Sequence, residues 1–157
     1  MNFNASIVIP SIRPNSWINI IPNLINSAGK HNIEIIFVGP EKPDWLDQSE
    51  ANWISSIVFY KDYGNPSRCF QIGASIARGK LIGLSVDDAV AFNGAIEKAI
   101  DLVVDEKDIV ILKYVEGGVN LGYDRLVGNY HDLYWTAGYH DDLRMPLVNP
   151  KWICGLP

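Results

Sequence analysis

Two adjacent carboxylates, Asp87 and Asp88, follow directly on the apolar run 81–86, which has the length and composition of a buried strand. Carboxylates at such a position repel each other and lose water, which is unfavourable unless a cation lies between them and an anionic group. Mg²⁺ and Mn²⁺ prefer oxygen ligands and often bind through one or two carboxylates together with substrate phosphates. The pair therefore predicts a metal–diphosphate site. The alternative is a solvated loop that caps the next element, because a dipeptide is a weak signal.

Three more short segments stand at the ends of predicted strands, as the acidic pair does. Together the four segments are 10–13, 39–41, 61–64 and 87–88. In open α/β sheets, ligands bind outside the carboxyl ends of the strands. We therefore expect the four segments to converge around one binding site.

The sheet that must position these segments follows from apolar, β-branched runs. The predicted strands are 5–10, 33–38, 57–60, 81–86 and 109–112. The stretch 41–52 is polar and contains proline, so we expect it on the surface. Strands alternate with helical segments, which implies a mostly parallel sheet covered by helices.

Helical spacing predicts three helices in the same region. They run from 15 or 16 to 28, from 66 up to Gly79, and from the residues after Asn93 onward. Asn65 and Asn93 are the predicted caps, since Asn accepts hydrogen bonds from the free amides of a first turn. Pro22 lies inside the first helix and is expected to kink or split it.

The composition indicates an ordinary globular domain, with 157 residues, 48% of them hydrophobic and 20% charged. The formal net charge of −5 argues against nucleic acid as the main partner, because that function normally needs a basic patch. Cys69 and Cys154 lack metal-binding spacing and predict free thiols in a reducing compartment. The first residues lack signal-peptide features, and no apolar run reaches the roughly 20 residues of a membrane span. We expect a soluble, cytoplasmic protein without a membrane span.

The stretch 65–88 resembles the central region of family 2 glycosyltransferases. That family has a pattern close to P-S-R-x-x-N-x-G-x-x-x-A-x-G-x-x-I, then a strand and an acidic cluster of the DxD type. The positions that match in register are Pro66, Ser67, Arg68, Gly73, Ala77, Gly79 and Ile82, with Asp87 and Asp88 at the acidic cluster. The first two predicted strands also resemble those of the family, so the resemblance covers residues 5–104.

This resemblance implies a GT-A-type, Rossmann-like α/β fold in one domain, 1–157. Residues 1–115 would be the nucleotide-sugar-binding core and 116–157 a short acceptor-side segment. The implied function is a metal-dependent, hexosyltransferase-like glycosyltransferase that takes a nucleoside-diphosphate sugar, with UDP favoured, and transfers the sugar to an unknown acceptor. Mn²⁺ or Mg²⁺ would neutralise the diphosphate. The last acid of the family's cluster is normally the direct metal ligand, so Asp88 ranks first and Asp87 second, and Asp87 would also contact the nucleotide-sugar.

Three positions depart from the family pattern. The usual Asn before the helix glycine is Gln71, and the acidic cluster is only Val86-Asp87-Asp88. The family's acidic-glycine-serine loop after the second strand, whose Asp contacts the base, reads Gly39-Pro40-Glu41. Glu41 is therefore the candidate for the base contact, or that contact is absent.

Other binding roles follow from the same resemblance. Pro10, Ser11 and Arg13 would form a wall of the nucleotide pocket, and Asp62 would hydrogen-bond the base or the ribose. Arg68, in the first turn of its helix, would add positive charge near a phosphate, helped by the helix N-terminus. The alternatives are a plain turn, a surface acid and a surface arginine.

The C-terminal part, after Gly117-Gly118, is predicted as loops with one short helix near 124–134. An inverting transferase needs a general base near the acceptor hydroxyl, and the resemblance places that acid in this part. Asp141 and Asp142 are the candidate bases, and His140 is a further candidate metal ligand. The alternative is an exposed polar turn.

Two other functions stay open. Only about 50 residues follow the helix after Asn93, so a nucleotide-sugar-binding remnant or partial domain with little transfer is one alternative. A nucleotidyltransferase is the other. That class usually has a glycine-rich loop with a basic residue after the first strand, and residues 10–14 do not form such a loop.

Overall fold

The computed structural model of the chain describes residues 2–104, 108–110, 112 and 144–146. The chain divides into two units, Met1–Val90 and Ala91–Pro157. The four segments that are expected to form the binding site all belong to the first unit.

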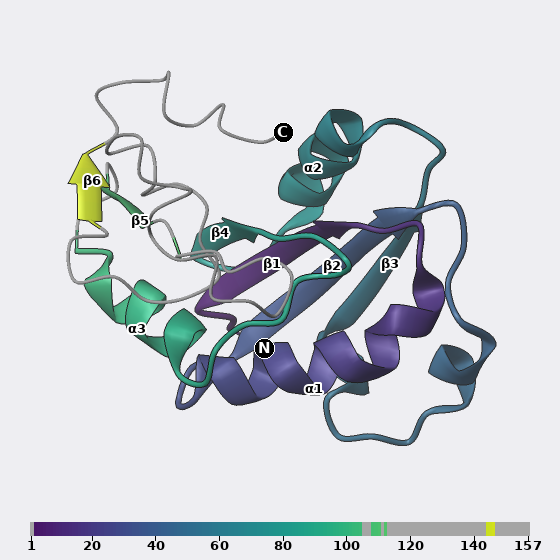
Figure 1. Cartoon of the computed structure of the whole chain (residues 1–157), viewed down its shortest axis with the longest axis horizontal. Coiled ribbons are helices and arrows are strands. Elements are labelled where there is room, and N and C mark those ends of the chain that lie inside the picture. Colours follow the sequence, from purple (N-terminus) through teal and green to yellow (C-terminus); the bar gives the residue numbers. More distant parts are fainter. Residues whose placement is uncertain (1, 105–107, 111, 113–143, 147–157) are drawn as a thin grey trace, which may run out of the picture. The chain divides into compact units, whose positions relative to one another are not determined.

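A four-stranded parallel sheet is the centre of the first unit (Figure 1). Its strands are β1 (Ala5–Pro10), β2 (Ile33–Gly39), β3 (Ile57–Lys61) and β4 (Leu81–Leu84). Their order is β3-β2-β1-β4, and every neighbouring pair is parallel. The four strands therefore end at one edge, which we call the carboxyl edge. The predicted α/β class with a parallel sheet flanked by helices is confirmed.

Helix α1 (Trp17–Ala28) packs on one face of this sheet. Its buried positions recur at helical spacing and are Trp17, Ile20, Ile21, Leu24, Ser27 and Ala28. The Trp17 ring stacks on Phe37 of β2, with ring centroids 3.7 Å apart. Ile9 is the register partner of Phe37, so its side chain belongs to the same face. This packing fixes the start of α1 against the end of β1.

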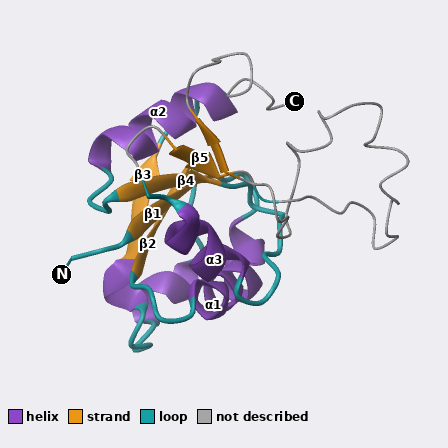
Figure 2. Cartoon of the chain, turned by 90° about the vertical axis from the view of Figure 1, so that its left-hand side faces the viewer, coloured by secondary structure: helices purple, strands orange, loops and turns teal. Residues whose placement is uncertain are grey.

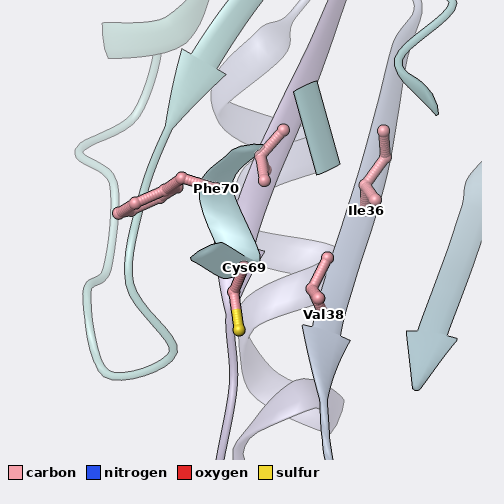
Figure 3. Packing of buried hydrophobic residues seen from close by; sticks show 5 residues of the cluster. Ile36, Val38, Cys69 and Phe70 are labelled. Atoms are coloured by element: carbon pink, nitrogen blue, oxygen red, sulfur yellow. The ribbon is translucent and has the colours of Figure 1, made fainter. Parts of the chain in front are cut away.

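Helix α2 (Pro66–Ile76) packs on the opposite face, and Figure 2 shows the two helices on either side of the sheet. Cys69 and Phe70 of α2 belong to one buried cluster with Val8, Ile36 and Val38, and the close view in Figure 3 draws the side chains of this cluster. The predicted cap is confirmed, since the Asn65 Oδ1 accepts a hydrogen bond from the Arg68 amide at 3.0 Å.

The contact between α2 and the sheet is close because Gly73 has no side chain. A Cβ atom on Gly73 would lie 2.2 Å from the Val8 Cγ1. The neighbouring Cys69 is a free, buried cysteine, and burial raises the pKa of its thiol. Cys69 therefore serves as a small core side chain at this contact.

A buried acid lies between β1 and the residues that follow α2. Glu34 of β2 has no exposed surface and accepts a hydrogen bond from the Ser6 Oγ at 2.7 Å. Arg78 donates to the same carboxylate from its backbone amide at 3.0 Å and from its Nε at 2.6 Å. Burial by itself would raise the pKa of Glu34, but the hydrogen bonds from Ser6 and Arg78 and the charge of Arg78 lower it. Glu34 is therefore an ionised, fully paired group that joins sequence-distant segments.

Pro22 lies inside α1 without splitting it, so the expected split is wrong. Pro22 is on the exposed side of the helix, and so is Ile18, whose carbonyl would have received the missing amide hydrogen bond. Water can satisfy that carbonyl, and the helix continues.

Short 3-10 helices occupy the connecting segments of the first unit. They are η1 (Pro14–Ser16), η2 (Asp44–Gln48) and η3 (Ile54–Ser56). The stretch 41–52, expected on the surface, is exposed at half of its residues, and Pro43 and Leu46 are buried. Across the described residues, no helix has the length and apolar character that a membrane crossing requires.

The second unit contains α3 (Ala95–Leu102) and a two-stranded antiparallel pair, β5 (Asp108–Val110) with β6 (Arg144–Pro146). The strand predicted at 109–112 overlaps β5, which pairs with β6 and not with the parallel sheet. The predicted cap Asn93 is wrong: the cap of α3 is Gly94, whose φ of 73° suits glycine. The short helix predicted near 124–134 lies outside the described residues.

Candidate functional site

Asp87 connects the end of β4 to the loop that follows β1. Its residue surface is only 4% exposed. The Asp87 Oδ2 accepts three hydrogen bonds, from the Ser11 Oγ at 3.0 Å and from the amides of Ile12 and Arg13 at 2.9 Å each. The carboxylate therefore holds the backbone of the 11–13 loop, and this oxygen is already engaged.

The same loop is tied to the core through Trp17. The Trp17 Nε1 donates to the Ser11 Oγ at 2.7 Å, so the Ser11 hydroxyl accepts from Trp17 and donates to Asp87. The ring of Trp17 is immobilised by its stacking on Phe37. A continuous series of contacts thus runs from Phe37 in the core, through Trp17 and Ser11, to Asp87 at the carboxyl edge.

Gly39, at the end of β2, allows this loop to lie against the sheet. A Cβ atom on Gly39 would lie 1.8 Å from the backbone oxygen of Ser11. The Ser11 amide also donates to the Val38 carbonyl at 2.9 Å, and the Asp62 amide donates to the Gly39 carbonyl at 2.9 Å. The loops after β1 and β3 therefore both depend on the backbone at the end of β2.

Replacing Gly39 with Ala is expected to lower the free energy of unfolding by about 1–3 kcal/mol, because backbone atoms cannot move away as a flexible side chain can. Urea unfolding measures the change. Gly64→Ala is the matched control, since the nearest atoms there belong to the side chains of Arg68 and Asp62. Equal stability losses in the two variants would contradict the close contact between Gly39 and Ser11.

Arg13 lies between the two carboxylates of the acidic pair. Its Nη1 is 2.5 Å from the Asp88 Oδ2 and 3.4 Å from the Asp87 Oδ1. The hydrogen bond to Asp88 and the negative charges of Asp87 and Asp88 raise the pKa of Arg13. The Asp88 side chain is 59% exposed and that of Arg13 is 51% exposed. Asp87 is thus a buried anchor, whereas Asp88 presents its carboxylate to solvent.

Asp62 and Arg68 form a second group at the carboxyl edge. The Arg68 Nε and Nη2 donate to the two carboxylate oxygens of Asp62 at 2.9–3.1 Å. The Gly64 amide donates to the same carboxylate at 2.6 Å. The hydrogen bond from Arg68 lowers the pKa of Asp62. The two residues were expected to contact the ligand separately, and here they pair with each other.

The remaining predicted residues contribute less. Pro10 is half-buried at the end of β1, and Glu41 is exposed beyond the end of β2. No hydrogen bond or ion pair joins Glu41 to either group among the described residues. His140, Asp141 and Asp142 lie outside the described residues. The structure therefore brings together Ser11, Arg13, Asp87 and Asp88, which we call the acidic-pair site.

The sequence patterns missed two residues on which the acidic-pair site depends. The sequence places Trp17 only within the first predicted helix, and it places Gly39 in the segment 39–41 expected at the binding site without giving it a role there. The signals that could have identified them are an indole N–H close to a predicted loop, which needs a buried acceptor, and a glycine at a strand end, which often marks a close backbone approach.

The charged groups of the acidic-pair site are two carboxylates and one guanidinium. In the described part of the chain, no group of three or more His, Cys, Asp or Glu residues is arranged to hold a metal. Mg²⁺, however, is often bound by one or two carboxylates with substrate phosphates and water completing its shell. The guanidinium of Arg13 already stands in as the cation between Asp87 Oδ1 and Asp88 Oδ2. Asp87 Oδ1 and Asp88 Oδ2 are therefore the oxygens at this site that could hold a divalent ion in place of the guanidinium.

Comparison with known proteins does not assign the chain to a family. No protein-family model matches the sequence, and no curated protein matches it.

Proposed function

We propose that the carboxyl edge binds a nucleoside-diphosphate sugar, with UDP favoured, together with Mn²⁺ or Mg²⁺, and that the protein is a glycosyltransferase with a GT-A-type fold. The observation that carries this proposal is the exposed Asp88 carboxylate. It is paired with the Arg13 guanidinium beyond the carboxyl end of β4 in the parallel sheet. Ligands of such sheets bind at this edge. The resemblance of 65–88 to family 2 glycosyltransferases supplies the substrate class.

In this proposal each residue has a separate task. Asp88 and the Oδ1 of Asp87 would hold the metal, while the Oδ2 of Asp87 keeps the 11–13 loop in place. A bound divalent ion would neutralise the diphosphate and stabilise the leaving nucleoside diphosphate. Arg13 would face the nucleotide, whereas the buried Ser11 would support the 11–13 loop through Asp87. Asp62 would bind the base or ribose once Arg68 turns toward a phosphate. The sugar acceptor would be bound by the C-terminal part, where Asp141 and Asp142 are the candidate bases.

Donor binding should stabilise the folded protein only when the metal and Asp88 are both present. A ligand at a concentration of 100 times its dissociation constant adds about 2.7 kcal/mol, which corresponds to a melting-temperature rise of about 5–10 °C at this chain length. We expect such a rise for one member of a panel of nucleoside-diphosphate sugars in Mn²⁺, and no rise after chelation. Differential scanning fluorimetry is the measurement.

Asp88→Asn should remove the stabilisation, whereas Asp47→Asn should keep it. Asp47 is the matched control because it is also an exposed acid paired with a basic side chain, Lys42, outside the acidic-pair site. A panel that gives no metal-dependent rise in the wild type would refute the proposal. Release of the sugar to water or to an acceptor, followed by chromatography, then distinguishes a transferase from a protein that only binds the donor.

A further inference from the structure

We propose that Arg13 is an internal counter-ion that closes the acidic-pair site until a metal and a diphosphate arrive together. This inference rests on the proposed function and adds to it a role for Arg13 in controlling metal binding. The guanidinium takes the position between Asp87 Oδ1 and Asp88 Oδ2 that a divalent ion would need. A metal ion alone must therefore compete with a positive charge that belongs to the protein.

The backbone of Arg13 is held by hydrogen bonds, whereas its side chain is half exposed and, among the described residues, is held by the two carboxylates alone. Its amide donates to Asp87, and its carbonyl accepts from the Ser16 amide at 3.0 Å and from the Ser16 Oγ at 2.7 Å. The Arg13 side chain is 51% exposed, and the Asp88 side chain to which it is bonded is 59% exposed. The ion pair between Arg13 and the exposed Asp88 is of the weak, solvent-exposed kind, so the guanidinium can leave Asp88 at little cost.

A diphosphate gives the displaced guanidinium a new partner. Arginine binds phosphate oxygens through two parallel N–H donors, and such charge-assisted bonds are stronger than neutral ones. When Arg13 turns to the diphosphate, Asp88 is released to the metal, and the metal in turn binds the same diphosphate. Metal and nucleotide are therefore expected to bind with positive coupling, and by linkage each strengthens the other equally.

Removal of the guanidinium should strengthen Mn²⁺ binding in the absence of nucleotide and should weaken the effect of UDP on Mn²⁺ binding. In the absence of nucleotide, Arg13→Gln is expected to bind Mn²⁺ about threefold to tenfold more tightly than the wild type, since the competing charge is gone. With UDP present, the affinity gain for Mn²⁺ should be about tenfold smaller in Arg13→Gln than in the wild type. Electron paramagnetic resonance of free Mn²⁺ measures both constants, with protein-free titrations correcting for the Mn²⁺–UDP complex.

Lys42→Gln is the matched control, because it removes one positive charge from an exposed ion pair outside the acidic-pair site. It should bind Mn²⁺ as the wild type does, and circular dichroism should show that both variants are folded. Equal Mn²⁺ affinity of Arg13→Gln and wild type without UDP, with equal gains on adding UDP, would overturn the role of Arg13 and leave the proposed function standing. Absence of Mn²⁺ binding in every variant, with and without UDP, would overturn the proposed function as well.

Discussion

Asp87→Asn is expected to lower the free energy of unfolding by about 2–3 kcal/mol, whereas Asp88→Asn should change it by less than about 0.5 kcal/mol. The two acids are neighbours, but only Asp87 is buried and accepts hydrogen bonds from Ser11, Ile12 and Arg13. An amide at position 87 cannot replace both oxygens. If its oxygen keeps the three donors, its NH₂ group faces the Arg13 guanidinium and two donors are opposed.

Urea unfolding followed by circular dichroism measures this difference. The same pair of variants separates structure from binding, because Asp88→Asn should stay stable and lose the metal-dependent response to a donor. Asp87→Asn should lose stability whether or not a metal is present. Equal stability of the two variants would contradict the role of Asp87 as the anchor of the 11–13 loop.

This contrast shows how far the sequence determines the site. The apolar run before Asp87 predicts the strand, and a parallel sheet predicts that the loop after β1 comes close. The ranking of Asp88 above Asp87 as the metal ligand came from the family resemblance and stays a prediction. The sequence alone does not reveal that one Asp87 oxygen is engaged by two backbone amides and a hydroxyl, because that depends on the path of residues 75 positions earlier.

The fold itself was more accessible to sequence reasoning than the pairing of charges. Runs such as 33–38 are too apolar to lie anywhere but in the interior, and Asn65 before Pro66 is a strong local start signal. Ion pairs follow no such local rule, even between residues as close in sequence as Asp62 and Arg68, which are six positions apart. Asp62 and Arg68 are each compatible with a ligand, and their mutual ion pair appears only when β3 and α2 are placed together.

Glu34 was part of a strand in the sequence and nothing more, yet its carboxylate is expected to be a main determinant of stability. Replacing Glu34 with Gln should lower the free energy of unfolding by about 2–4 kcal/mol, because the fully buried side chain could no longer satisfy all the donors that bind its carboxylate. Arg78 would keep its guanidinium near an uncharged amide, and one of the three donors to the carboxylate would meet an NH₂ group. Glu50→Gln, at an exposed position, is the matched control.

The pH dependence of unfolding tests the same group in a second way. The pKa of Glu34 is lower in the folded protein than its ordinary value of 4.5. A carboxyl group of this kind contributes stability that is fully present above the unfolded pKa and is lost as the pH falls through the folded pKa. Below pH 4.5 the free energy of unfolding of the wild type should therefore fall more steeply than that of Glu34→Gln. The difference between the two free energies should narrow toward acid pH. A difference that stays constant from pH 7 to pH 3 would mean that the ionised state of Glu34 does not carry this stability.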